Sequence, residues 1–139
     1  MFGRIVAISG LILFLAACVQ LTYVQLLRKD EEIVTYGLYS VVRHPQYFGI
    51  IGVTLGITIM CIQSDFGGQV TEIWPIQVLG YILLAGYEER HLMKEHEEEY
   101  QSYKEKVAFI FPIPAIPLVP EPLVSLAVAY FVLFLLNVV

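Results

Sequence analysis

Four apolar stretches, separated by two charged segments, dominate the pattern of hydrophobic and polar positions. The apolar stretches occupy residues 5–27, 47–62, 73–87 and 123–139, and the charged segments occupy residues 28–43 and 88–121. The first carries no charge and, at about 1.5 Å rise per residue, can cross a hydrocarbon core of roughly 30 Å. The other three are short for a span, so polar ends must complete them or the bilayer must thin around them. The pattern predicts an all-α, multi-pass membrane helix bundle with about four transmembrane helices, forming a single domain over residues 1–139.

The third apolar stretch is expected to continue beyond the membrane as a cytoplasmic extension. Only two glycines weaken the helical pattern between residue 75 and about residue 106, and Pro75 suits the first turn of such a helix. Trp74 is expected at the outer membrane boundary. Beyond the membrane, one stripe at helical spacing carries Leu92, His96, Tyr100, Tyr103 and Val107.

A proline-rich segment follows, with prolines at positions 112, 114, 117, 120 and 122. This spacing excludes a helix and favours an extended path. We interpret the segment as a linker that returns the chain to the last helix. The alternative is that it forms a wall of a ligand cavity.

Composition supports a membrane protein, because 58% of the residues are hydrophobic against about 45–50% in soluble domains. The net charge is −5, and no basic patch exists to neutralise phosphates, which argues against nucleic acid as a partner. Lysines and arginines lie in both charged segments but not in the loop at 63–72. The positive-inside rule therefore predicts cytoplasmic charged segments and both termini outside.

The first apolar stretch has a competing interpretation. Leu15-Ala16-Ala17-Cys18 resembles the lipobox of a lipoprotein signal, which would be cleaved before Cys18. The chain, however, stays apolar for nine residues beyond Cys18, and positive charges follow the stretch. A retained transmembrane helix is favoured. Cys18 and Cys61 both lie in apolar stretches without CxxC spacing, so neither a disulfide framework nor a cysteine metal site is expected.

The segment "VVRHPQYFG" at 41–49 carries the first candidate chemistry. Pro45 can open the helix that follows it. In a purely structural interpretation, Arg43 is a positive anchor and the nearby tyrosines are interfacial. However, a helix N-terminus presents free N–H groups that suit an anion such as a carboxylate, and Arg43 would add a bidentate donor.

The second candidate is the adjacent pair Glu88 and Glu89 at the cytoplasmic end of the third apolar stretch. Ionisable groups near membrane depth are costly and usually functional. The pair would suit an ammonium or a sulfonium, helped by tyrosine faces. Glu88 and His91 also have the spacing of di-iron bundles, but the required second motif and facing glutamates are missing, so no metal site is expected.

Together, these motifs resemble the isoprenylcysteine carboxyl methyltransferase and phospholipid methyltransferase family of integral-membrane methyltransferases. The resemblance covers about residues 33–112. It rests on Gly37-Leu38-Tyr39, Arg43-His44-Pro45, Tyr47, Gly49, Glu88-Glu89, Leu92, Glu99-Tyr100, Tyr103, Val107 and Phe111-Pro112. Two departures stand out: Leu38 replaces the family's usual proline, and His96-Glu97 replaces a Phe-Gly pair that breaks the helix. The second departure predicts an unbroken helix with His96 on the stripe.

The resemblance implies S-adenosylmethionine-dependent methyl transfer at the cytoplasmic face, to a lipid or lipidated acceptor from the bilayer. It implies catalytic roles for Arg43, His44 and Glu88. The implied cofactor-binding residues are Tyr39, His44, Pro45, Tyr47, Gly49, Glu88, Glu89, Tyr100 and Tyr103. A carboxylate of isoprenylcysteine type is the first acceptor considered and a phospholipid amine the second. Only the amine needs a general base, such as His44 or a glutamate, and the sequence does not choose between the two acceptors.

Three further possibilities remain open from the sequence. Another subunit could complete the acceptor site, because this chain has only one helix before the motif, and a homo-oligomer is possible. A small four-helix cation exporter is a rival, although it would need an ionisable residue deep within a span, and three of the four stretches have none. The third possibility is a non-catalytic membrane subunit on the same scaffold.

Overall fold

The computed structural model describes residues 1–27, 33–62, 67–113, 116 and 119–138, and over these residues it is helical without a β-strand. The all-α prediction is confirmed. The helices, with the short 3-10 helix η1, are α1 (Phe2–Leu27), η1 (Gly37–Ser40), α2 (Pro45–Ile62), α3 (Gly67–Glu95), α4 (Glu97–Lys106) and α5 (Glu121–Val138).

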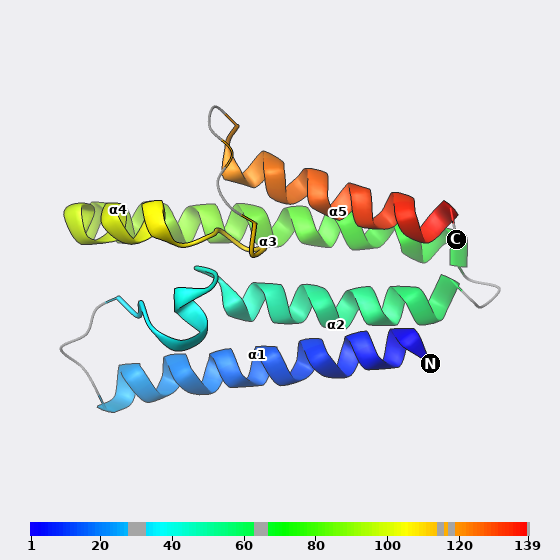
Figure 1. The fold of residues 1–139 in the computed structure, drawn as a ribbon, viewed down its shortest axis with the longest axis horizontal. Helices are drawn as coiled ribbons and strands as arrows, with labels where there is room; N and C mark the ends of the chain where they lie inside the picture. Colours follow the sequence, from blue (N-terminus) through cyan, green and yellow to red (C-terminus); the bar gives the residue numbers. More distant parts are fainter. Residues whose placement is uncertain (28–32, 63–66, 114–115, 117–118, 139) are drawn as a thin grey trace.

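The long helices lie side by side in the order α1, α2, α3 and α5 (Figure 1). The start of α1 and the end of α5 lie at one end of the bundle, whereas η1 and α4 lie at the other (Figure 1). This arrangement places the described parts of both charged segments at the same end. We call it the polar end. Its assignment to the cytoplasmic side remains a prediction.

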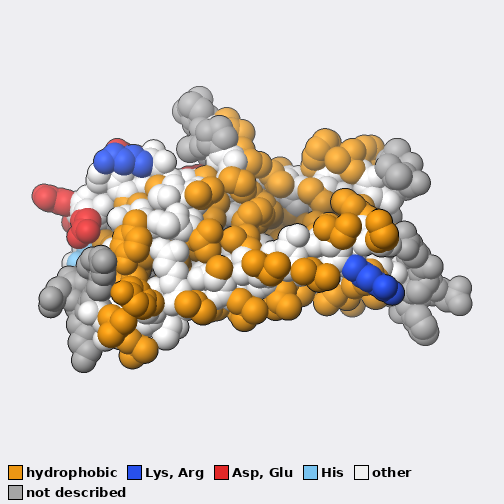
Figure 2. All heavy atoms as spheres, turned by 60° about the horizontal axis from the view of Figure 1, so that its bottom comes forward, with side chains coloured by type: hydrophobic (Ala, Val, Ile, Leu, Met, Phe, Trp, Pro, Cys, Tyr) orange, Lys and Arg blue, Asp and Glu red, His pale blue; other side chains and the backbone are white. Residues whose placement is uncertain are grey.

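Within the described residues, two helices are long and apolar enough to cross a membrane. These are α1, with a mean hydropathy of 2.4, and α2, with 1.6; residues Glu121–Leu136 of α5 form a shorter apolar helix. Figure 2 shows apolar side chains spread along one face of the bundle, with charged side chains towards its ends. The helices therefore suit a membrane bundle and indicate membrane association.

The contact between α1 and α2 depends on glycines that allow the two backbones to approach closely. A Cβ atom added at Gly10 would lie 2.5 Å from the backbone nitrogen of Val53. A Cβ atom at Gly49 would lie 2.5 Å from the backbone nitrogen of Phe14. Gly49, which the resemblance implied as a cofactor-binding residue, thus lies in this helix contact, with no room for a side chain.

We expect Gly10→Ala to lower the free energy of unfolding by about 1–3 kcal/mol, because the clash is with backbone and α1 must move away. Gly80→Ala is the matched control, since nothing lies within 4 Å of a Cβ atom there. The control should be neutral or stabilising by up to about 1 kcal/mol through its helix propensity. Unfolding in detergent, monitored by circular dichroism, measures the free energy of unfolding of both variants. Equal effects of the two substitutions would contradict the close contact.

Helix α3 starts earlier than the sequence predicts, and the expectation that Pro75 lies in its first turn is wrong. Pro75 lies inside the helix rather than in its first turn. Trp74 is only 2% exposed, and its indole nitrogen donates to the carbonyl oxygen of Ile51 over 3.3 Å. A large aromatic side chain whose N–H finds a buried partner gains more from the core than from an interfacial position.

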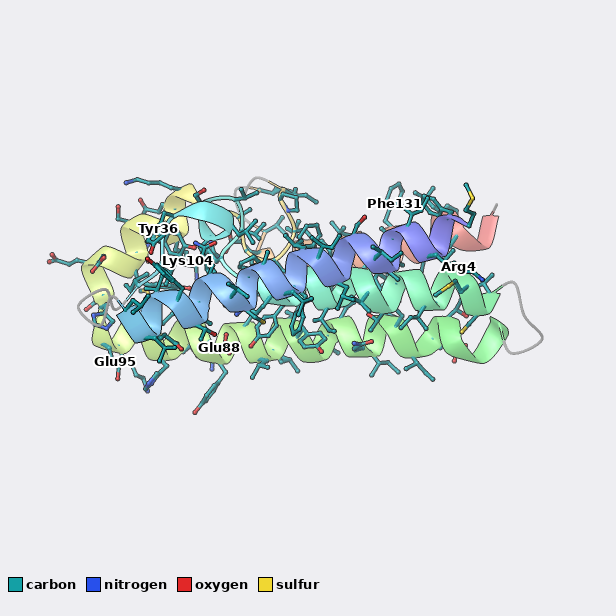
Figure 3. The ribbon with its side chains drawn as sticks, turned by 90° about the horizontal axis from the view of Figure 1, so that it is seen from below. Arg4, Tyr36, Glu88, Glu95, Lys104 and Phe131 are labelled. Carbon is teal, nitrogen blue, oxygen red and sulfur yellow. The ribbon has the colours of Figure 1, made fainter. Side chains whose placement is uncertain are left out.

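The prediction of an unbroken helix through His96 is also wrong. Helix α3 ends at Glu95, His96 has φ −137° and ψ 53°, and α4 begins at Glu97. The two buried tyrosines of α4, Tyr100 and Tyr103, form a cluster with Ile33, against which Leu92, Met93 and Val107 pack. Burying these aromatic surfaces requires α4 to turn back from the line of α3, as the chain does in Figure 3.

Candidate functional site

The candidate site lies at the polar end, where the start of α2 meets the end of α3, α4 and the beginning of the proline-rich segment. Figure 3 labels Glu88, Glu95, Lys104 and Tyr36 in this region, far from Arg4 and Phe131 at the opposite end. Gly37 has φ +64°, a conformation that favours glycine, and shapes the turn before α2. Gln20 of α1 holds this turn, because its side chain donates to the carbonyl of Tyr36 and accepts from the N–H of Leu38.

His44 lies between the two adjacent glutamates of α3. Its Nε2 is 3.3 Å from Oε1 of Glu89, and its Nδ1 is 3.5 Å from Oε2 of Glu88. The imidazole stacks on the ring of Tyr47, whose hydroxyl donates to Oε1 of Glu88 over 2.5 Å. The structure therefore brings together His44, Tyr47 and both glutamates, which lie more than 40 residues apart in the sequence.

Arg43 is the centre of a buried ion network. Its side chain has no exposed surface, and its Nε donates to Oε1 of Glu89 over 2.7 Å. The rest of the guanidinium pairs with Glu121 and donates to the carbonyl oxygens of Lys104 and Val107. Because these partners take up its donors, Arg43 holds four segments of the chain together rather than presenting a free fork to a ligand.

The network shifts the protonation of its members. Burial raises the pKa of Glu89, but the hydrogen bond to His44 and the charge of Arg43 outweigh it and lower this pKa to about 2. Burial lowers the pKa of His44, yet its hydrogen bonds to Glu88 and Glu89 outweigh burial, and the net pKa is raised above 6.5. The site therefore favours ionised glutamates and a protonated imidazole.

Two residues just before the proline-rich segment, Ala108 and Phe109, pack against the start of α2. The N–H of Arg43 donates to the carbonyl of Ala108 over 2.8 Å, and the N–H of His44 donates to that of Phe109 over 3.3 Å. Phe109 is buried and packs edge-on against the His44 ring. The neighbouring carbonyls therefore satisfy both of these N–H groups, so neither is free to bind an anion.

A cavity of about 340 Å³, which we call the His44 cavity, adjoins the network. Its size falls within the roughly 300–1,000 Å³ of small-molecule sites. Six of the implied site residues line it: Tyr39, Arg43, His44, Glu88, Tyr100 and Tyr103. The other four implied residues, Pro45, Tyr47, Gly49 and Glu89, lie outside its lining.

The tyrosines at the cavity are held in place by hydrogen bonds and burial. The hydroxyl of Tyr103 donates to the carbonyl of Tyr39 over 2.5 Å, and the hydroxyl of Tyr39 donates to Gln46 over 3.0 Å. Burial raises the pKa of Tyr39, Tyr100 and Tyr103, so all three remain neutral phenols. They give the cavity uncharged aromatic walls.

Three members of the site were missed by the sequence interpretation: Glu121, Lys104 and Phe109. Glu121 reads as an ordinary acidic residue in the first turn of α5, and Lys104 as part of a solvated helix face. In the structure, Lys104 lies 3.1 Å from Oε2 of Glu89. Of these three, only Glu121 carries a sequence signal of a role in the site, because it is a lone carboxylate among prolines and apolar residues.

The fold and the site together define a helical bundle of membrane type with a buried ion network at its polar end. A scan against protein families matches residues 1–107 to the family described as "Protein of unknown function (DUF1295)", and the chain belongs to this family. No curated protein matches the chain, and no solved structure does.

Proposed function

We propose that this protein is an integral-membrane methyltransferase that uses S-adenosylmethionine at the His44 cavity. The proposal rests on the sequence resemblance to the isoprenylcysteine carboxyl and phospholipid methyltransferases. Its main structural support is a single carboxylate, Glu88, that lines an aromatic cavity next to an otherwise neutralised network. S-adenosylmethionine carries its methyl group on a sulfonium, and the sulfur leaves as a neutral thioether when the methyl group is transferred.

Glu88 differs from Glu89 in how far its charge is already satisfied. The Glu89 side chain is 7% exposed and pairs with both Arg43 and Lys104. The Glu88 side chain is 41% exposed, and among the described residues it has only His44 and the hydroxyl of Tyr47 as polar partners. Glu88 is therefore the carboxylate that can attract a cation entering the cavity, and Glu89 belongs to the supporting structure.

The lining suits the remaining parts of the ligand. Tyr39, Tyr100 and Tyr103 offer aromatic faces that attract a sulfonium and can stack on an adenine ring. Gln25, Gln46 and His91 also line the cavity and provide polar groups for the amino-acid part. Arg43 is a positioning residue in this proposal: it fixes Glu89, the start of α2 and the start of α5.

The state of His44 favours an acceptor that needs no general base. Both imidazole nitrogens face carboxylates, and these raise the pKa of His44, which favours the protonated form of the imidazole. A carboxylate acceptor can attack the methyl carbon directly, whereas an amine must first lose a proton. We therefore propose a lipidated carboxylate as acceptor ahead of a phospholipid amine. The cavity's role is to align the reactants and exclude water.

Calorimetric titration of the detergent-solubilised protein tests the proposed ligand. S-adenosylmethionine should bind, and roughly tenfold more tightly than S-adenosylhomocysteine, which lacks the sulfonium charge. A tenfold ratio corresponds to about 1.4 kcal/mol, a modest energy for one charge pair in a partly desolvated site. Absence of S-adenosylmethionine binding by folded protein would refute the proposal.

A further inference from the structure

A second cavity, of about 550 Å³, lies on the other side of α3 from Glu88, and we call it the Arg90 cavity. It is lined by the end of α3, Lys104 of α4, Phe109 just before the proline-rich segment, and Glu121 and Pro122 of α5. Tyr87 and His91 line both cavities, so the two meet along this edge of α3. The methyl-transfer proposal does not use the Arg90 cavity.

The charges in this cavity favour an anion. Its basic residues are Arg90, Lys94 and Lys104, and its acidic residues are Glu89 and Glu121. Both carboxylates are already paired with the buried Arg43, and Glu89 is also paired with Lys104. Among the described residues, Arg90 and Lys94 have no ion-pair or hydrogen-bond partner. Two cations therefore remain to attract a negative group.

An exposed apolar stripe on α3 leads directly to these cations. Ile76, Leu79 and Leu83 are exposed and recur at the three- and four-residue spacing of one helix face. Tyr87, Arg90 and Lys94 continue the same stripe to the polar end, and all three are exposed. Along this helix face, apolar residues are followed by an aromatic residue and then by two basic residues. This order matches an anionic lipid, whose apolar chains are followed by a negatively charged headgroup.

We propose that the Arg90 cavity binds the headgroup of an anionic phospholipid, whose chains lie along the Ile76–Leu83 face. Phe109, Met93 and Pro122 give the cavity an apolar lining beneath the cations, so it favours an amphiphile over a free ion. This site is separate from the cofactor site and stands whether or not the protein transfers methyl groups.

Titration of detergent-solubilised protein with short-chain phosphatidylglycerol, phosphatidylcholine and inorganic phosphate tests the proposal. Phosphatidylglycerol should bind about tenfold or more tightly than phosphatidylcholine, since each basic residue near an anionic headgroup contributes favourably. Inorganic phosphate should bind much more weakly than phosphatidylglycerol. Equal affinity for the two lipids would overturn the anionic site, and tight binding of inorganic phosphate would overturn the assignment to a lipid.

Two double variants with the same loss of charge locate the site. Arg90→Gln with Lys94→Gln should weaken phosphatidylglycerol binding about tenfold or more, whereas Arg4→Gln with Lys106→Gln should leave it within about twofold. Arg4 and Lys106 are exposed and lie outside the cavity lining. The charge-conserving exchange Arg90→Lys with Lys94→Arg should restore most of the affinity. Equal weakening by both neutralised pairs would overturn the proposal.

Discussion

Replacing Arg43 by methionine is expected to lower the free energy of unfolding by about 3–5 kcal/mol. The substitution removes the buried cation that Glu89 and Glu121 share, and breaking a buried ion pair by removing one partner is far more costly than losing a surface pair. It also leaves the carbonyl oxygens of Lys104 and Val107 without their donor. Arg43→Lys should recover only part of the loss, because one ammonium cannot reproduce the guanidinium's fork.

Arg90→Met is the matched control for this prediction. Arg90 is also an arginine at the polar end, next in sequence to Glu89, but it is exposed. Its substitution should change the unfolding free energy by no more than about 0.5 kcal/mol, as is usual for surface positions. Thermal and denaturant unfolding in detergent measure both variants. An Arg43→Met variant as stable as Arg90→Met would contradict the central role of the network.

Replacing Glu88 by glutamine is expected to weaken S-adenosylmethionine binding by at least about tenfold, or about 1.4 kcal/mol. Glutamine keeps the size of the side chain and an acceptor oxygen for the Tyr47 hydroxyl, so the substitution removes mainly the charge. The affinity for S-adenosylhomocysteine should change little, because this ligand carries no sulfonium. Calorimetric titration of both ligands into wild-type and variant protein provides the comparison.

Glu95→Gln controls for the loss of one negative charge at the same end of α3. Glu95 is exposed, its Oε1 lies 3.4 Å from Nε2 of His91, and it does not line the His44 cavity. Its substitution should leave both affinities within about twofold of the wild-type values. If Glu88→Gln weakened both ligands equally, the carboxylate would act through the shape of the cavity and not through its charge, against the proposal.

Hydrophobic patterning alone predicted the positions of α1, α2 and α5 to within a few residues. The apolar stretches at 5–27, 47–62 and 123–139 correspond to α1 (Phe2–Leu27), α2 (Pro45–Ile62) and α5 (Glu121–Val138). These elements could be predicted because an apolar run or a proline at a helix start is a local signal. The break at His96 could not, because burial of Tyr100 and Tyr103 against distant parts of the chain determines it.

The sequence predicted which residues form the site better than it predicted the ion pairs between them. The resemblance grouped His44 with Glu88 and Glu89, and the structure brings these three together. The assignment of Arg43 to a ligand carboxylate did not foresee Glu121, which pairs with it from 78 residues away. Nothing local in the sequence distinguishes an arginine that will meet a ligand from one that will meet a distant glutamate.

The most direct test of the methyltransferase proposal is transfer of label from S-adenosylmethionine carrying a radioactive methyl group. Purified protein is incubated with native membranes, and label is followed into lipid extracts and into base-labile esters. We expect label in a membrane fraction, released by base if the acceptor is a carboxylate and retained if it is an amine. Folded protein that leaves all label on S-adenosylmethionine, with membranes present, would contradict the methyltransferase proposal.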